Sequence, residues 1–327
     1  MMHAIEVAGY GDASQLRYVE RDEPVPGPGQ VAIRVALTGV NFADIMARRG
    51  AYHAGSPPPF VPGLDCVGTI SALGDGVADL KVGQRVAAFV DAGSYAQTVL
   101  ARDVLTYPLH DRISDEAGAS LLLLVTAYHT LTFAGKIKAG ESVLVHAAAG
   151  GVGSTAVQIA KHLGAKPIIA TAGSSAKLSI ARGAGADVTI DYTKEDITAA
   201  VLRATENRGA DVILDSVAGD VFAASVEAFA PFGRYVIYGM SSGKPGEAKT
   251  PIFHTQNRSL VGFSAGHYRN LRPAVLREGT MAVLELVAAG VVTPIIGARF
   301  PLRDAAQAQT LVESRASHGK VLLDPTA

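Results

Sequence analysis

Between residues 143 and 263, short apolar runs alternate with stretches in which apolar residues recur every three to four positions. Runs of this length are typical of strands buried in a parallel sheet, and the longer spacing is typical of amphipathic helices. The pattern predicts strands at 143–145, 168–171, 188–191, 212–215, 235–238 and 260–263, with helices at 151–163, 176–184 and 222–229. Strands that alternate with helices predict an α/β fold built on a doubly wound parallel sheet.

The residues on either side of this region have a different pattern of apolar and polar positions. Positions 31–35 alternate between apolar and polar, and 67–73 and 85–90 are short β-rich runs bounded by Gly, Pro and Asp. These features predict a β-rich, partly open barrel. Beyond residue 268 the chain has two helix-like runs, at 281–288 and 305–314, and a last strand at 320–323, which we expect to pair with the N-terminal part. The predicted domains are therefore 1–122, 123–267 and 268–327, the first and last forming one unit.

The first apolar run leads directly into a glycine-rich turn. Ala148, Gly150 and Gly153 have the spacing of a G-x-G-x-x-G motif, with alanine at the first glycine position. Glycines in such a turn let the backbone approach a pyrophosphate, which the positive end of the following helix favours. Ordinary strand-to-helix turns also use glycine, so the motif indicates a dinucleotide only together with the surrounding alternation.

The second strand ends where a site selective for NAD places a carboxylate on the ribose. Residues 171–177 read Thr-Ala-Gly-Ser-Ser-Ala-Lys and contain no carboxylate. Two hydroxyls and the ammonium of Lys177 suit a dianionic 2′-phosphate, so the predicted cofactor is NADPH. The alternative is that Lys177 only solvates a helix surface.

Composition narrows the choice of partner and compartment. The chain is 48% hydrophobic with a formal net charge of -1, which gives no electrostatic reason to expect nucleic acid or an anionic membrane as partner. The N-terminus lacks the pattern of a signal peptide, and the single cysteine, Cys66, excludes an intramolecular disulfide. We expect a cytoplasmic protein in which Cys66 is a small core residue.

Several motifs together carry a family resemblance. The glycine turn, Thr-Ala-Tyr at 126–128 and Gly-Val-Asn-Phe-Ala-Asp at 39–44 resemble the zinc-independent medium-chain dehydrogenases/reductases, most closely the NADPH:quinone oxidoreductase (zeta-crystallin-like) group. The motifs at 62–65, 215–219, 313–315 and 319–320 extend the similarity over essentially the whole chain. The resemblance implies a Rossmann domain inserted in a GroES-like catalytic domain.

The positions that bind catalytic zinc in metal-dependent relatives hold other residues here. They read Asn41, Leu64 and the apolar run around Leu122, and one cysteine cannot form a four-cysteine structural site. Tetrahedral zinc needs thiolate, imidazole or carboxylate ligands, so we expect no metal. The predicted chemistry is direct hydride transfer from the nicotinamide.

The resemblance also implies roles for individual residues. Asn41 and Thr126 are expected beside the nicotinamide, the glycine turn around the pyrophosphate, and residues 173–177 around the adenosine phosphate. The implied cofactor residues are Asn41, Thr126, Gly150, Gly151, Val152, Gly153, Gly173, Ser174, Lys177, Tyr192, Ser216, Gly239, Ser241, Phe263 and Arg315. Without the family match, Tyr192 and Phe263 are equally well explained as core aromatics.

The proton donor is less clearly marked than the cofactor site. Relatives carry two tyrosines in the segment 44–52, and Met46 stands at the first position, which leaves Tyr52 as the matching phenol. Tyr52 either lines the substrate pocket or lies in a surface loop. The predicted catalytic residues are Asn41 and Tyr52, and a buried Asp44–Asp65 pair is more often structural than catalytic.

Three functions fit these residues. The leading one is NADPH-dependent reduction of a quinone, a small-molecule electrophile. The same hydride also reduces an α,β-unsaturated ketone, aldehyde or enoyl thioester, and a third class binds NADPH without turnover. The resemblance suggests a homodimer formed through an edge strand of the Rossmann sheet, for which 260–263 is the candidate.

Overall fold

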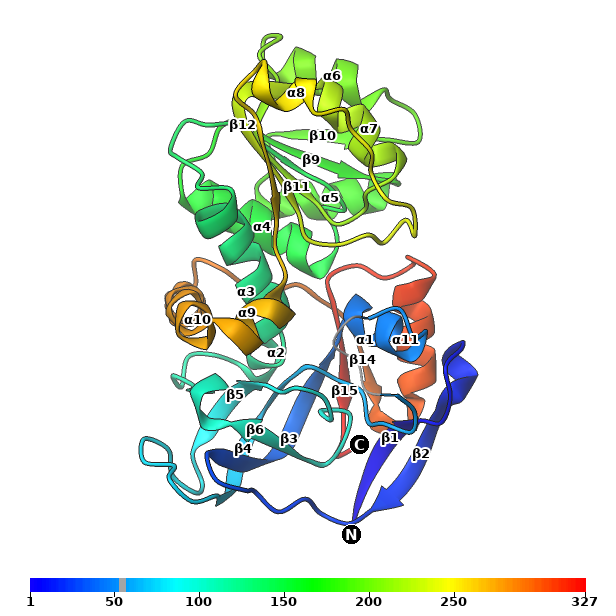
Figure 1. Ribbon diagram of the computed structural model, residues 1–327, viewed down its shortest axis with the longest axis vertical. Helices are drawn as coiled ribbons and strands as arrows, with labels where there is room; N and C mark the ends of the chain where they lie inside the picture. Colours follow the sequence, from blue (N-terminus) through cyan, green and yellow to red (C-terminus); the bar gives the residue numbers. More distant parts are fainter. Residues whose placement is uncertain (53–56) are drawn as a thin grey trace. The chain divides into compact units, whose positions relative to one another are not determined.

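The structure is a computed structural model that describes residues 1–52 and 57–327. The chain forms two compact units (Figure 1). Unit 1 contains Met1–Leu124 and Ala265–Ala327, and unit 2 contains Val125–Ser264. The first unit is thus built from both ends of the chain, with the second inserted between them.

Unit 2 is built on a six-stranded sheet in the order β10-β9-β8-β11-β12-β13. All five neighbouring pairs are parallel. The strands are β8 (Val143–Val145), β9 (Ile168–Ala172), β10 (Val188–Asp191), β11 (Ala210–Asp215), β12 (Phe229–Ile237) and β13 (Ser259–Gly262). The chain winds outward from β8 to one edge and from β11 to the other, which confirms the doubly wound sheet. The point where the winding reverses, between β8 and β11, is where such sheets bind ligands.

The helices of unit 2 pack on a core of strand and aromatic side chains that includes Leu144, Ile213, Phe222 and Tyr235. They are α3 (Leu121–His129, which begins in unit 1), the π-helix η3 (Thr130–Ala134), α4 (Gly151–His162), α5 (Ser175–Ala184), α6 (Ile197–Ala204), α7 (Asp220–Glu227) and α8 (Pro251–His254). The pattern did not predict α6, whose eight residues offer barely two turns. The predicted helix 222–229 runs two residues too far, because Phe229 begins β12 and packs edge-on against Tyr235, with ring centroids 5.8 Å apart.

Unit 1 contains a seven-stranded sheet in the order β14-β15-β3-β4-β5-β7, with β6 also paired to β3. Its strands are β3 (Gln30–Val40), β4 (Asp65–Leu73), β5 (Arg85–Phe89), β6 (Thr98–Arg102), β7 (Thr106–Pro108), β14 (Ile296–Pro301) and β15 (Lys320–Asp324), beside a separate pair, β1 (Met2–Val7) and β2 (Leu16–Arg21). Two register shifts between β3 and β4 allow the long strand to bend. The last strand pairs antiparallel with β3, as the sequence predicts.

Helices alternate with the strands of unit 1, and the predicted catalytic residues Asn41 and Tyr52 lie just before and just after the first of these helices. The helices are α1 (Phe42–Arg48), α2 (Asp115–Gly118), α9 (Ala265–Leu271), α10 (Pro273–Ala288) and α11 (Ala305–Glu313), with short 3-10 turns η1 (Ala13–Gln15), η2 (Asp103–Leu105) and η4 (Leu302–Asp304). α10 begins eight residues before the predicted run at 281, because Pro273 at its first position is already set for a helix. Within the described residues, no helix is long and apolar enough to cross a membrane.

Candidate active site

Most of the predicted cofactor residues of unit 2 follow directly on the carboxyl ends of its parallel strands. The glycine turn follows β8, Gly173 and Ser174 follow β9, Tyr192 follows β10, Ser216 follows β11, Gly239 and Ser241 follow β12, and Phe263 follows β13. Because the carboxyl ends of parallel strands lie along one edge of a sheet, the predicted residues from 150 to 263 lie along this edge. Asn41, Tyr52 and Arg315 belong to unit 1.

The glycine turn leaves the start of α4 open to an anion. Gly150 caps the helix in an extended conformation, and the first turn, 151–153, carries no acidic side chain. The first amides of a helix have no carbonyl partner within it, so they point at whatever lies beyond its N-terminus. A Cβ on Gly153 would lie 2.5 Å from the Ala147 carbonyl oxygen, so only glycine lets α4 approach β8 this closely.

A second polar corner forms after β9. Ser174 caps α5, and its hydroxyl accepts a hydrogen bond from the Lys177 backbone at 3.4 Å. A Cβ on Gly173 would lie 2.6 Å from the Tyr192 hydroxyl, so the glycine makes room for that ring. Tyr192 is 46% exposed, and the core interpretation of this residue is wrong. Partial burial lowers the pKa of Lys177, and a bound dianion would reverse that shift.

Thr126 and Phe263 are packed more tightly than the rest of the set. Phe263 is 6% exposed and stacks on His129 with ring centroids 5.6 Å apart. Thr126 is buried on α3. The core interpretation therefore fits Phe263, although it does not fit Tyr192.

The loops after β11 and β12 are held together by backbone contacts. Oδ1 of Asp215 accepts from the amides of Val217 at 2.7 Å and Ala218 at 3.0 Å, which fixes the turn after β11. The Ser241 amide donates to the Ser216 carbonyl at 2.9 Å. A Cβ on Gly239 would come within 3.0 Å of that same carbonyl oxygen, so these two predicted residues are in close contact with Ser216.

In unit 1, Asn41 is the centre of a buried polar cluster. Its Nδ2 donates to Oδ1 of Asp65 at 2.7 Å, and its Oδ1 accepts from Nζ of Lys320 at 2.6 Å. Lys320 Nζ also lies 3.7 Å from Oδ2 of Asp65. Because both ends of the amide are engaged, its orientation is fixed. Lys320 was not predicted as a site residue, since its partner Asn41 lies on a distant strand end.

Asp44 extends this cluster toward Tyr95. Its Oδ2 accepts from the Asn41 backbone amide at 2.8 Å and from the Tyr95 hydroxyl at 3.1 Å. Burial, followed by the charge of Asp65, raises the pKa of Asp44 to about 7, against the opposing hydrogen bond from Asn41. Asp44 is therefore partly protonated at neutral pH.

Tyr52 is partly buried in the segment that follows α1, so it is neither a free loop side chain nor a core residue. Burial raises the pKa of its phenol, and the charge of Arg269 opposes this shift. Arg269 is 3% exposed and donates to the Val90 carbonyl at 2.7 Å. No motif in the sequence marks this arginine, because a single cation in a helical pattern is ordinarily a surface residue.

The former zinc positions are lined by apolar and hydrogen-bonded groups. Leu64 is buried, Cys66 is a fully buried core residue as expected, and the Leu122 amide donates to Oδ2 of Asp65 at 2.9 Å. Over residues 1–52 and 57–327, no three His, Cys, Asp or Glu side chains are grouped so as to hold a metal ion.

Arg315 lies just beyond α11, exposed and in a left-handed conformation with φ 58°. Asn41, Asp65 and Tyr52 lie elsewhere in the same unit.

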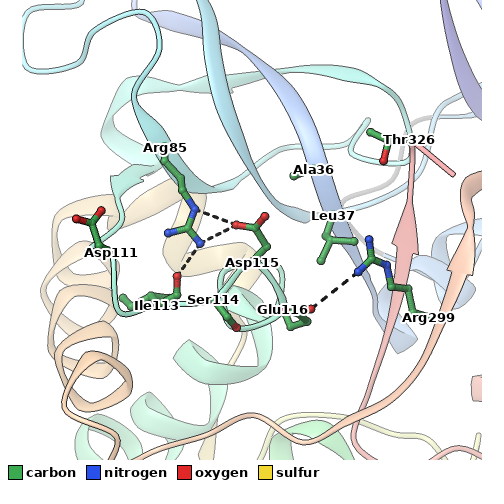
Figure 2. Close-up of a pocket in the computed structure, with 10 residues that line it drawn as sticks. All are labelled: Ala36, Leu37, Arg85, Asp111, Ile113, Ser114, Asp115, Glu116, Arg299 and Thr326. Atoms are coloured by element: carbon green, nitrogen blue, oxygen red, sulfur yellow. Dashed lines mark hydrogen bonds and ion pairs between the residues drawn. The ribbon is translucent and has the colours of Figure 1, made fainter.

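Figure 2 shows a polar pocket of about 490 Å³ in unit 1 that contains none of the predicted site residues. Arg85 is bound there to Asp115 at 2.6 Å, and Arg299 lies 3.9 Å from Glu116. A pocket lined by ion pairs suits neither a quinone ring nor an enone, so we do not place the substrate in it.

Comparison with known proteins agrees with this geometry. Residues 27–111 match the alcohol dehydrogenase GroES-like domain, and residues 151–289 match the zinc-binding dehydrogenase family. A Pseudomonas syringae quinone oxidoreductase superposes with a TM-score of 0.93 at 33% identity, covering 99% of this chain and 100% of that one. This chain belongs to the medium-chain dehydrogenase/reductase family, in its zeta-crystallin-like group.

Two further relatives show the breadth of this group. The Escherichia coli quinone oxidoreductase complexed with NADPH superposes with a TM-score of 0.92 at 32% identity, covering 99% of this chain and all of that one. The human synaptic vesicle membrane protein VAT-1 homolog is 30% identical over 99% of this chain and 87% of its own length. The family is one of oxidoreductases, and these relatives differ enough that the substrate does not follow from membership.

Proposed function

We propose that this protein is an NADPH-dependent reductase that transfers a hydride directly to a quinone. The observation that carries the proposal is the pair of turns that follow β8 and β9. The first is a glycine turn at a helix N-terminus, and the second is rich in hydroxyls, contains Lys177 and has no carboxylate. The first suits a pyrophosphate and the second a 2′-phosphate. Similarity to quinone oxidoreductases, one of them complexed with NADPH, supports the same reading.

NADPH, when bound, supplies the hydride, and the protein supplies position and charge. The amides of 151–153 would hold the pyrophosphate, and Ser174 and Lys177 the adenosine phosphate. The residues proposed to complete the cofactor site are Asn41, Thr126, Gly173, Tyr192, Ser216, Gly239, Ser241, Phe263 and Arg315.

Tyr52 is the proposed proton donor. Because burial raises the pKa of its phenol, the group stays protonated at neutral pH and can donate to the oxygen that gains charge as the hydride arrives. The phenolate then recovers a proton from water. One hydride and one proton convert a quinone to a hydroquinone, so the proton donated by Tyr52 completes the reduction. Asn41, fixed by Asp65 and Lys320, is proposed to orient the nicotinamide.

The test is the loss of NADPH absorbance with a panel of benzoquinones, naphthoquinones, enones, alkenals and an enoyl thioester. Turnover of quinones supports the proposal, and turnover of activated alkenes alone would assign the second substrate class. Tight NADPH binding with no turnover of any of them would assign a binding protein. Failure to bind NADPH would overturn the cofactor assignment.

We also propose that the protein is a homodimer joined through β13. This strand is the edge of the six-stranded sheet, and Leu260 on it is 47% exposed. An exposed apolar edge is a ready surface for pairing with a second copy. Sedimentation that gives the mass of one chain at micromolar concentration would contradict the proposal.

A further inference from the structure

A chain of buried hydrogen bonds lies next to the turns that follow β8 and β9, which are called the cofactor turns because NADPH is proposed to bind there. His146, the residue after β8, is 1% exposed. Its Nδ1 lies 2.9 Å from the hydroxyl of Thr171 in β9, and its Nε2 lies 2.8 Å from the hydroxyl of Ser225 in α7. Thr171 and Ser225 are themselves buried. The imidazole therefore bridges two elements that are separated in the sequence by more than fifty residues.

The hydrogen-bond partners fix the tautomer of this imidazole. The Ser225 hydroxyl donates its single proton to the Val221 carbonyl at 2.7 Å. It must therefore accept from Nε2–H of His146, which leaves Nδ1 to accept from the Thr171 hydroxyl. Burial lowers the pKa of His146 to about 4, which keeps the ring neutral at pH 7. Both ring nitrogens are satisfied in this one arrangement.

The same network reaches the turn after β11. The Ser225 hydroxyl lies beside the Tyr235 hydroxyl, which donates to Oδ2 of Asp215 at 2.9 Å. The other oxygen of Asp215 holds the amides of 217 and 218. One connected set of side chains thus ties together the turns that follow β8, β9 and β11.

The ends of the network lie at the backbone atoms that begin the cofactor turns. The amide of His146 donates to the Leu214 carbonyl at 3.1 Å, and the next residue, Ala147, has φ 49°. The Ala148 amide donates to the Thr171 carbonyl at 3.0 Å. Thr171 thus contacts the glycine turn through its backbone and the imidazole through its hydroxyl. Gly173 and Ser174 follow only two residues later.

We propose that His146 is a positioning residue that sets the spacing between the glycine turn and the 173–177 turn. The pyrophosphate and the 2′-phosphate of NADPH must reach the two turns at the same time. A change in the spacing between the turns therefore weakens binding even when each turn keeps its own structure. The inference rests on the proposed binding of NADPH. It adds a role for three buried side chains, Thr171, His146 and Ser225, that do not touch the cofactor.

The variants that test this remove one bond at a time. Thr171→Val and Ser225→Ala each delete one hydroxyl, His146→Leu deletes both bonds, and His146→Gln keeps a donor and an acceptor. The matched control is Thr205→Val. Its hydroxyl is also buried in unit 2, where it donates to Val201 at 2.8 Å and accepts from Gly209 at 3.0 Å. Thr205 caps the C-terminus of α6, in the segment that leads to the amino end of β11, whereas the proposed cofactor turns follow the carboxyl ends of the strands.

Binding of NADPH and of adenosine 2′-monophosphate is measured by isothermal titration calorimetry. The monophosphate has no 5′-phosphate, so it reaches only the 173–177 turn. Urea unfolding is measured in parallel. We expect Thr171→Val and Ser225→Ala to weaken NADPH binding by about three- to tenfold, and His146→Leu by about tenfold or more. Binding of the 2′-monophosphate should change little, His146→Gln should recover most of the NADPH affinity, and Thr205→Val should lower stability without changing either affinity.

Equal NADPH affinity in Thr171→Val, Ser225→Ala and Thr205→Val would overturn the inference while leaving NADPH binding intact. An equal loss for NADPH and the 2′-monophosphate would also overturn it, because spacing would not be the cause. A wild-type protein that does not bind NADPH would instead overturn the proposed function, and the inference with it. Thr171→Val and Ser225→Ala decide the matter even where His146→Leu does not fold.

Discussion

The two units bury polar side chains in opposite ways. In unit 2, the Thr171–His146–Ser225 network is built around a neutral imidazole whose two nitrogens are both hydrogen-bonded. In unit 1, the cluster around Asn41 holds the ammonium of Lys320 and the carboxyls of Asp65 and Asp44. Oδ1 of Asp44 has no hydrogen-bond partner among residues 1–52 and 57–327. A satisfied neutral network fixes geometry, whereas a charged and incompletely satisfied one holds a proton that can be exchanged.

The cluster of unit 1 should break when its cation is removed. Lys320→Met leaves the buried carboxylate of Asp65 without its ammonium, and removing one partner of a buried pair costs about 3 to 5 kcal/mol. The free energy of unfolding in urea measures this loss. A triple variant that replaces all three polar groups, Asn41→Leu/Lys320→Met/Asp65→Leu, should recover much of the lost free energy of unfolding. A single Lys320→Met variant as stable as wild type would show that the cluster is hydrated rather than buried.

Stability should depend on pH in opposite directions in the two units, through His146 in unit 2 and Asp44 in unit 1. Because burial holds the pKa of His146 at about 4, below its ordinary 6.5, the unfolded chain binds more protons between these values. Stability from this residue is full above pH 6.5 and is lost as pH falls toward 4, by about 3 kcal/mol in total. The pH profile of His146→Gln should lack this acid loss. A parallel profile in the variant would contradict the assignment.

The contribution of Asp44 to stability should decrease as pH rises, opposite to that of His146. Its pKa is raised from 3.8 to about 7, so the folded state binds more protons across that window. The contribution of this group to stability is present below pH 3.8 and is lost as pH rises toward 7. The groups that face it are Asp65, Lys320 and Tyr95. Asp44→Asn, measured over the same pH range, should flatten this loss and leave the acid limb of His146 unchanged.

The glycine turn allows a sharper test of unit 2. Gly153→Ala places a methyl 2.5 Å from the Ala147 carbonyl oxygen, so α4 must move away from the turn. A displacement of this kind should weaken NADPH binding by about a hundredfold. Gly183→Ala is the control, because a Cβ there meets nothing within 4 Å and should raise stability by about 0.5 to 1 kcal/mol. Unchanged NADPH affinity in Gly153→Ala would exclude this turn as the pyrophosphate site.

The preference for NADPH over NADH should decrease when Lys177, in the turn after β9, is replaced. Lys177→Ala is expected to weaken NADPH binding by about 1 to 3 kcal/mol and to leave NADH binding nearly unchanged, because only NADPH carries the 2′-phosphate. The difference should shrink with added salt. Lys138→Ala, at an exposed lysine before β8, is the matched control. Equal loss for both cofactors would make Lys177 a structural residue.

The smallest expected effect is that of a chelator. Since Asn41, Leu64 and Leu122 stand at the zinc positions, prolonged treatment with a chelator should leave quinone reduction unchanged. Elemental analysis of the purified protein checks the same point. About one zinc per chain, with activity lost on its removal, would contradict the direct hydride mechanism.

Local features of the chain were predictable because each depends on neighbours in sequence. The strands around 143, 168, 188 and 212 lie where apolar runs predict them, since a buried strand needs little more than such a run. The end of α7 was not predictable in the same way. Whether Phe229 continues a helix or begins a strand depends on Tyr235, against which it packs.

The sequence by itself determined the order of strands and helices, the glycine turn, the missing carboxylate after β9 and the missing zinc ligands. These depend on residue type and short spacing. Only the tertiary structure decided that Lys320 donates to Asn41, 279 residues away, that Arg269 acts on Tyr52, and that His146 joins Thr171 to Ser225. The energy of a buried polar group depends on which partners the fold brings to it, and no local pattern encodes those partners.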